Sequence, residues 1–180
     1  MKTLCIKTLK LKKKIKKTHL YKKKRMIKKN STKIREECGV FGISNINDAS
    51  ALAALGLHAL QHRGQEGCGI GSYDGKNYYS EKRFGLVGDN LNNEDTIKKL
   101  PGSYAIGHNR YSTTGGKILR NVQPFFADTN AGGIGVSHNG NFTNAITLRK
   151  KLVEDGAIFY TTSDSETIVQ LIARSKKEKN

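Results

Sequence analysis

Cys38 is the residue whose type and position most clearly suggest chemistry, because a Lys-rich segment ends there and an apolar, strand-like segment begins. A thiol ordinarily has a pKa near ~8.5, so only a few per cent is thiolate at neutral pH. A free α-amine, with a pKa of about 7.7–8.0, can take the thiol proton directly or through water. We therefore expect Cys38 to be a nucleophile only as the first residue of a mature chain, after the 37 residues before it are removed. The alternative is a small buried apolar side chain.

Four polar clusters follow Cys38 at the expected ends of strands. They lie at 61–65 (Gln-His-Arg-Gly-Gln), 108–115 (His-Asn-Arg-Tyr-Ser-Thr-Thr-Gly), 138–141 (His-Asn-Gly-Asn) and 161–166 (Thr-Thr-Ser-Asp-Ser-Glu). A single Gly-containing polar cluster is typical of a turn. Four such clusters that follow one Cys-Gly pair indicate a functional site more specifically than any one of them does.

Together these clusters resemble the class II glutamine amidotransferases, the N-terminal-nucleophile (Ntn) glutaminases, and most closely the glutaminase half of the amidophosphoribosyltransferases. The likeness spans roughly Arg35 to Arg174. It rests on the order and spacing of Glu-Glu-Cys-Gly-Val-Phe-Gly, Leu-Gln-His-Arg-Gly-Gln-Glu, Arg-Tyr-Ser-Thr-Thr-Gly, Gln-Pro-Phe, His-Asn-Gly-Asn and Thr-Ser-Asp-Ser-Glu. The glucosamine-phosphate synthases share the layout but favour Tyr-Arg-Gly, where this chain has His62-Arg63-Gly64.

The resemblance implies glutamine as substrate and Cys38 as nucleophile, with its own freed α-amine as the base. It implies the side-chain amide of Asn139 and the N–H of Gly140 as oxyanion donors. One such donor typically lowers a barrier by ~3–4 kcal/mol. A plain Asn-Gly turn is the alternative.

Two charged residues match those that bind the free amino acid in the family. Arg110 corresponds to the arginine for the α-carboxylate, which a guanidinium binds in a bidentate manner, although a surface ion pair is an alternative. Asp164 corresponds to the aspartate for the α-ammonium, and capping of the following helix is a competing role compatible with it. Tyr111 and Thr113 are expected to line the pocket, and Arg63 to support it through hydrogen bonds.

The resemblance further implies a four-layer αββα Ntn-hydrolase sandwich with mainly antiparallel sheets, C-terminally incomplete here. We expect residues 1–37 to be a basic, disordered leader or propeptide and residues 38–180 to be a partial glutaminase domain. The family's phosphoribosyltransferase domain is expected to be absent. No cofactor is expected in this chain, since Mg would belong to that absent domain, which binds phosphoribosyl pyrophosphate (PRPP). A separate phosphoribosyltransferase chain and a homo-oligomer are the implied partners.

Local patterns separately favour an α+β body with largely antiparallel pairing. Strands are expected at 39–44, 68–73, 76–81, 104–109 and 133–138, and helices at 49–62, 92–100, 143–155 and 167–174. We expect Asp48 to cap the first helix and Asp74-Gly75 to form a two-residue hairpin turn. The residues Ser163 to Glu166 predict a capping box. Cys68 is expected to be a small core residue, and no pair of histidines has zinc-ligand spacing.

The charge is concentrated ahead of Cys38. Residues 1–37 carry 16 Lys and Arg against 2 acidic residues, whereas the rest carries 16 against 13, so the net charge of +17 says little about the folded part. Such a Lys-rich segment is typical of a solvated tail, and Met26 offers a second start that leaves a shorter leader. Nucleic-acid binding is not expected of the body, which has no basic motif. With three cysteines, no secretory signal and no apolar run of ~18 residues, we expect a cytoplasmic protein without a membrane span.

Three functional hypotheses and one weaker alternative to the first follow from the sequence. The first is the glutaminase part of an amidophosphoribosyltransferase, a transferase of the glycosyltransferase kind that makes phosphoribosylamine in the first committed step of purine (IMP) biosynthesis. The second is a non-catalytic remnant or regulatory module that binds glutamine, and a weaker one is another class II amidotransferase such as glucosamine-phosphate synthase. The third makes the basic tail an RNA-binding arm, whose binding would be salt-sensitive.

Overall fold

The computed structural model describes residues 37–111, 118–130 and 132–175. Its strands are β1 (Gly39–Ile43), β2 (Gly67–Tyr73), β3 (Tyr78–Phe84), β4 (Tyr104–Arg110), β5 (Phe125–Thr129) and β6 (Gly132–Val136). Its α-helices are α1 (Ala49–Ala59), α2 (Val87–Asn90), α3 (Glu94–Lys98), α4 (Ala145–Glu154) and α5 (Glu166–Arg174), and two 3-10 turns are η2 (Gln61–Arg63) and η3 (Leu119–Asn121).

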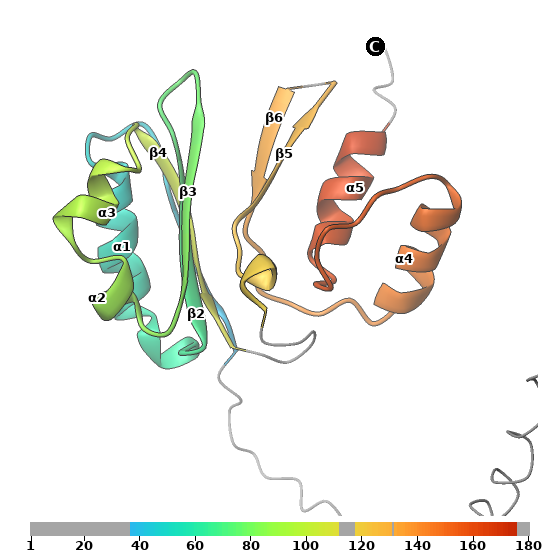
Figure 1. The fold of residues 1–180 in the computed structure, drawn as a ribbon, viewed down its shortest axis with the longest axis horizontal. Helices are drawn as coiled ribbons and strands as arrows, with labels where there is room; N and C mark the ends of the chain where they lie inside the picture. The colour runs from blue at the N-terminus through green and yellow to red at the C-terminus, as the bar shows by residue number, and fades with distance from the viewer. Residues whose placement is uncertain (1–36, 112–117, 131, 176–180) are drawn as a thin grey trace, which may run out of the picture. The chain divides into compact units, whose positions relative to one another are not determined.

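The strands form two antiparallel sheets. The first has the order β1-β4-β2-β3, and the second pairs β5 with β6. Figure 1 shows α1, α2 and α3 covering the outer face of the first sheet, while α4 and α5 lie on the outer side of β5 and β6. The described residues therefore have the expected order of helical layer, sheet, sheet and helical layer, and the α+β prediction is confirmed.

The main core lies between α1 and the first sheet. Ala49, Ala53 and Leu57 recur at helical spacing on α1, and all three are fully buried. A Cβ at Gly107 of β4 would lie 2.6 Å from Leu57 Cδ1, so the glycine lets the helix approach the sheet closely. Small residues on both sides thus seat α1 directly on β4, the strand that carries Arg110 at its end.

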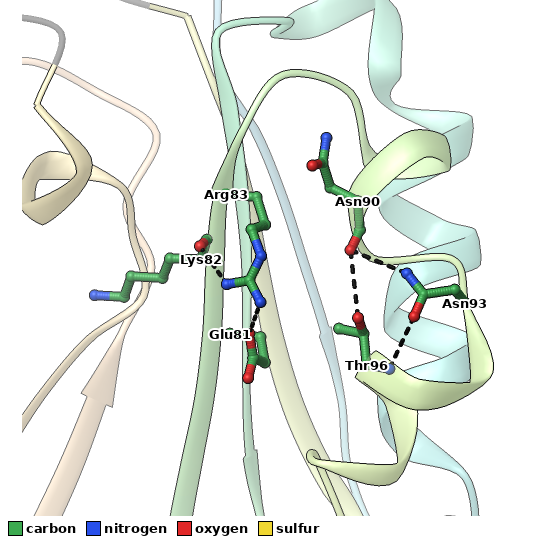
Figure 2. Close-up of polar contacts among 6 residues, drawn as sticks. All are labelled: Glu81, Lys82, Arg83, Asn90, Asn93 and Thr96. Atoms are coloured by element: carbon green, nitrogen blue, oxygen red, sulfur yellow. Dashed lines mark hydrogen bonds and ion pairs between the residues drawn. The ribbon is translucent and has the colours of Figure 1, made fainter.

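Successive side chains of β3 face opposite layers, as the period of a strand requires. Figure 2 shows Arg83 paired with Glu81 on one side of the strand and Lys82 pointing to the other side. Arg83 Nη2 lies 2.6 Å from Glu81 Oε2. The Lys82 ammonium lies 5.4 Å from the centroid of the Phe125 ring on β5. The rings of Tyr78 and Phe126 stack with centroids 4.0 Å apart, which joins the two sheets through aromatic contact.

Helix α3 is shorter than the predicted 92–100 helix, and α2 before it was not predicted. Asn93 is the N-cap of α3, because its Oδ1 accepts the N–H of Thr96 at 2.9 Å. Its Nδ2 donates to Asn90 O at 3.2 Å, so one side chain joins the end of α2 to the start of α3 (Figure 2).

Two further local predictions differ from the structure. Asp48 is the N-cap of α1, as predicted, but it has a φ of 58° and its side chain makes no capping hydrogen bond. The hairpin turn is four residues long rather than two, since Tyr73 pairs with Tyr78. Oδ1 of Asp74 accepts the N–H groups of Lys76 and Asn77, and these bonds lower the pKa of the carboxyl to about 2. The side chain therefore sets the turn.

Candidate active site

Cys38 lies one residue before β1, beside the end of β4. The pairing of Gly39 with Asn109 brings Cys38 next to Tyr111, which follows the last residue of β4. The Tyr111 N–H donates to Cys38 Sγ at 3.2 Å, and the thiol can donate to Tyr111 O at 3.3 Å. The half-buried sulfur is thus held against the backbone of the strand that carries Arg110.

Arg63 contacts Cys38 from η2, the short turn after α1. Its Nε donates to Cys38 O at 3.2 Å. The next residue, Gly64, packs directly on β4, because a Cβ there would lie 2.7 Å from Arg110 C and 2.8 Å from Arg110 O. Arg63 therefore bonds the backbone of Cys38, and the close packing of Gly64 fixes the turn that presents it.

Arg110 is buried, with 7% of its surface exposed. Its Nη1 donates to Asn121 O at 2.6 Å, and its Nε lies 4.0 Å from the carboxylate of Glu66. The surface ion pair that was the alternative reading does not describe this side chain. A buried guanidinium is suited to a planar carboxylate.

Asn121 connects Arg110 to the segment before α5. Its fully buried side chain donates through Nδ2 to Thr162 Oγ1 at 2.7 Å and accepts the Thr162 N–H at Oδ1 at 3.0 Å. Because its carbonyl also receives Arg110, this residue joins the end of β4 to the residues that precede Asp164.

Asp164 is turned toward the loop after β6 rather than toward helix α5. Its Oδ2 accepts the N–H of Phe142 at 2.9 Å. The N-cap of α5 is Ser165, whose side chain makes no capping bond. The predicted capping box is therefore wrong, because the Glu166 carboxylate instead accepts the N–H groups of Tyr160 and Thr161 at 2.8 and 2.7 Å.

The oxyanion candidates Asn139 and Gly140 are exposed in the loop between β6 and α4. The residue before them, His138, stacks its ring on Phe142 with centroids 5.4 Å apart. A Cβ at Gly140 would lie 2.6 Å from His138 Nε2, so the loop folds closely over that ring. We call residues 138–142 the oxyanion segment.

Hydrogen bonds and chain neighbours thus connect most of the predicted residues. The path runs from Arg63 and Cys38 to Tyr111 and Arg110, through Asn121 and Thr162 to Asp164, and on to Phe142 in the oxyanion segment. Tyr111 is 49% exposed at the start of this path. Thr113 lies outside the described residues.

Sequence reasoning missed three buried polar residues of this arrangement, namely Asn121, Gln123 and Ser165. Gln123 belongs to the quoted Gln-Pro-Phe motif, and Ser165 to the last polar cluster. Their place in or beside these motifs could have marked them as candidate site residues. Their hydrogen-bond partners, however, are 15 to 42 residues away in the chain, so the bonds could not be predicted from local sequence.

Cys68 and His108 have perturbed pKa values because they are buried. Burial raises the pKa of Cys68 to about 12, against a smaller opposing effect of the positive Arg83. Burial, with the positive charge of Arg110, lowers the pKa of His108 to about 4. Cys68 is fully buried on β2, as predicted for a core residue, and a neutral thiol there is a poor nucleophile.

Two cavities lie away from Cys38. Cavities of about 750 and 920 Å³ are lined by residues at the opposite end of β4, including Ser103 and Tyr104. Within residues 37–111, 118–130 and 132–175, no group of three His, Cys, Asp or Glu side chains is arranged to hold a metal ion. In the same part of the chain no helix is long and apolar enough to cross a membrane.

Comparisons with known proteins show what the whole chain is similar to. A profile described as glutamine amidotransferase domain matches residues 108–180. An amidophosphoribosyltransferase of Rhizobium etli is 59% identical over 143 residues, which cover 79% of this chain and 29% of the relative. Over about four fifths of its length, the chain is similar to amidophosphoribosyltransferases.

Further proteins show the same similarity. A chloroplastic amidophosphoribosyltransferase of Vigna aconitifolia is 54% identical over 80% of this chain and 30% of its own length. The solved structure of an allosteric regulatory enzyme of purine biosynthesis has a TM-score of 0.70 at 44% identity, covering 76% of this chain and 29% of that one. For the glutamine PRPP amidotransferase of B. subtilis, complexed with ADP and GMP, the TM-score is 0.68 at 42% identity, with the same coverage. The fold is therefore that of the family's Ntn-hydrolase sandwich, and the chain spans about 30% of the length of the curated relatives named here.

Proposed function

We propose that this chain hydrolyses glutamine to glutamate and ammonia, with Cys38 as nucleophile once residues 1–37 have been removed. The observation that carries the proposal is the contact of Cys38 Sγ with both backbone groups of Tyr111. This contact puts the thiol beside Arg110, from which hydrogen bonds through Asn121 lead to Thr162, two residues before Asp164. The match to the glutamine amidotransferase domain supports glutamine as the substrate.

The proposed mechanism needs one nucleophile and one base on the same residue. The freed α-amine of Cys38 takes the thiol proton, and the thiolate attacks the side-chain amide carbon of glutamine. The oxyanion that forms accepts hydrogen bonds from Asn139 Nδ2 and Gly140 N–H. The protonated amine then gives its proton to the leaving nitrogen, and ammonia departs. Water, deprotonated by the same amine, attacks the thioester, and the thiol leaves with a proton to regenerate Cys38.

The amino-acid end of glutamine is assigned to Arg110 and Asp164. The guanidinium would bind the α-carboxylate, and the Asp164 carboxylate would receive the α-ammonium while keeping its bond to the Phe142 N–H. Tyr111 and Thr113 are proposed to line the pocket, and Arg63 to support Cys38.

In the cell, we propose that the ammonia serves to form phosphoribosylamine from PRPP, as the similarity to amidophosphoribosyltransferases suggests. This proposal includes the transfer step and its Mg. It also includes a phosphoribosyltransferase partner chain and a homo-oligomer. So does a cytoplasmic location, which the odd cysteine count without a secretory signal supports.

The test begins with the mature N-terminus. Mass spectrometry should find chains that begin at Cys38, and these should release ammonia from glutamine and be labelled at Cys38 by a thiol-directed glutamine analogue. Cys38→Ala should abolish turnover, and Asn139→Ala should lower kcat by about 10²–10³-fold. A chain that begins at Cys38, folds and yet releases no ammonia would refute the proposal.

A second candidate is glutamine binding without turnover. It is favoured by the peptide bond between Glu37 and Cys38, because an amide nitrogen is not a base. It predicts that glutamine raises the melting temperature of the unprocessed chain while no ammonia appears. Arg110→Lys should then remove the thermal shift.

A further inference from the structure

The oxyanion segment is anchored at its start by the side chain of Gln123. Gln123 Oε1 accepts the His138 N–H at 2.6 Å, and Gln123 Nε2 donates to His138 O at 3.1 Å. One side-chain amide thereby makes the two bonds that a neighbouring strand would make to a paired residue. Because His138 O belongs to the planar peptide unit that leads into Asn139, these bonds set the orientation of that unit.

Ser165 completes this anchor from the start of α5. Its Oγ lies 3.3 Å from Gln123 Nε2 and 3.0 Å from His138 Nδ1. Gln123 and Ser165 are 5% and 2% exposed, so water hardly competes for these groups. At the far end of the segment, Asp164 Oδ2 accepts the Phe142 N–H. Residues 138–142 are therefore held at both ends by side chains from other parts of the chain.

We propose that Gln123 is a positioning residue of the glutaminase, which holds the oxyanion segment where its donors meet the developing charge. This inference rests on the proposed function, since it assumes the oxyanion role of Asn139 and Gly140. Such donors act when they lie about 2.7–3.1 Å from the oxyanion, and a misplacement of ~1 Å can cost about 10²-fold in rate. Gln123 acts through the backbone of His138 and need not touch the substrate.

The test compares the full wild-type chain with its Gln123→Leu variant. Both are used with the N-terminus that mass spectrometry finds for them. Gln170→Leu is the matched control, because Gln170 Nε2 also donates to a backbone carbonyl, that of Ile158 at 2.7 Å, but outside the oxyanion segment. Gln123→Leu should lower kcat by about tenfold or more. The KM for glutamine should stay within about threefold and the rate of Cys38 alkylation by iodoacetamide within about twofold, because Arg110 and Cys38 are untouched.

Hydrogen exchange provides a readout that does not depend on activity. Amides of residues 138–142 should exchange about tenfold faster or more in Gln123→Leu than in wild type. In Gln170→Leu their exchange rates should equal those of wild type. A wild-type chain that releases no ammonia refutes the proposed function, while exchange still reports whether Gln123 holds the segment. Turnover in Gln123→Leu within twofold of an active wild type overturns the positioning role.

Gln123→Glu keeps the test decisive if Gln123→Leu does not fold. A neutral carboxyl carries an O–H that can donate to His138 O, whereas the carboxylate would repel that carbonyl, and burial raises a carboxyl pKa. The kcat of this variant, divided by that of wild type at each pH, should therefore recover as the pH falls from about 8 to about 6. A ratio that does not change with pH would count against positioning, because a general loss of structure lowers kcat equally at every pH.

Discussion

Replacing Asn121 with alanine should loosen the connection between Arg110 and the segment before α5. The substitution removes the two hydrogen bonds that the fully buried side chain makes with Thr162, at 2.7 and 3.0 Å. The carbonyl that accepts Arg110 Nη1 remains, but the backbone that carries it loses its anchor.

The expected loss of stability follows from these contacts. A neutral intramolecular hydrogen bond contributes about 1 kcal/mol net, so two bonds give about 2 kcal/mol. Thr162 is exposed, so water can bond its freed groups and no large penalty for an unpaired partner is added. For a chain of this size, about 2 kcal/mol corresponds to a fall in Tm of roughly 4–8 °C.

The assay is urea unfolding of wild type, Asn121→Ala, Thr162→Val and the double variant. Thr162→Val removes Oγ1 but keeps the backbone N–H, so the coupling energy isolates one bond and should be about 1 kcal/mol. Asn92→Ala, at an exposed position, is the control and should stay within about 0.5 kcal/mol. A loss below about 0.5 kcal/mol for Asn121→Ala, or a coupling near zero, would refute the reasoning.

Three other predictions concern the core and its titrating groups. Burial and Arg110 lower the pKa of His108 to about 4. An unfolded histidine titrates near ~6.5, so between these values the unfolded state binds more protons. The free energy of unfolding should therefore fall by about 3 kcal/mol as the pH drops from about 6.5 to about 4, and His108→Gln should flatten that part of the profile of urea midpoint against pH. Iodoacetamide at about pH 8 should modify Cys68 only after unfolding, since burial raises its pKa to about 12; modification in the native chain, seen by peptide mass mapping, would contradict this. Leu57→Ala should cost about 2–5 kcal/mol in urea unfolding, and a cost below about 1 kcal/mol would mean that α1 is not seated on β4 as described.

The sequence was a good guide wherever local pattern and global fold agree. The order of most strands and helices and the burial of Cys68 followed from periodicity and turn residues. Of the polar clusters predicted at strand ends, those at 108–115 and 138–141 begin at the ends of β4 and β6, whereas the cluster at 161–166 lies between α4 and α5. β5 was missed because it follows directly on Gln123-Pro124, and a proline beside a polar residue is typical of a loop.

Side-chain partners were the part that local pattern could not supply. Glu166 has the right spacing for a capping box, yet its carboxylate bonds the backbone of Tyr160 and Thr161, upstream of the helix. Asp164 was weighed between helix cap and substrate ligand, and the described contact is with the Phe142 N–H, 22 residues away. Such choices are made by the packing of distant segments, which a single sequence does not display.

The contact of Gly64 with the backbone of Arg110 also limits how this sequence can vary over evolutionary time. No side chain fits there, since even a Cβ would approach backbone atoms to 2.7 and 2.8 Å. Any replacement must push apart the turn that holds Arg63 against Cys38 and the strand that ends in Arg110. One mutation at Gly64 would therefore disturb the nucleophile and the candidate carboxylate ligand together, and selection should tolerate almost no variation at a position that never touches the substrate.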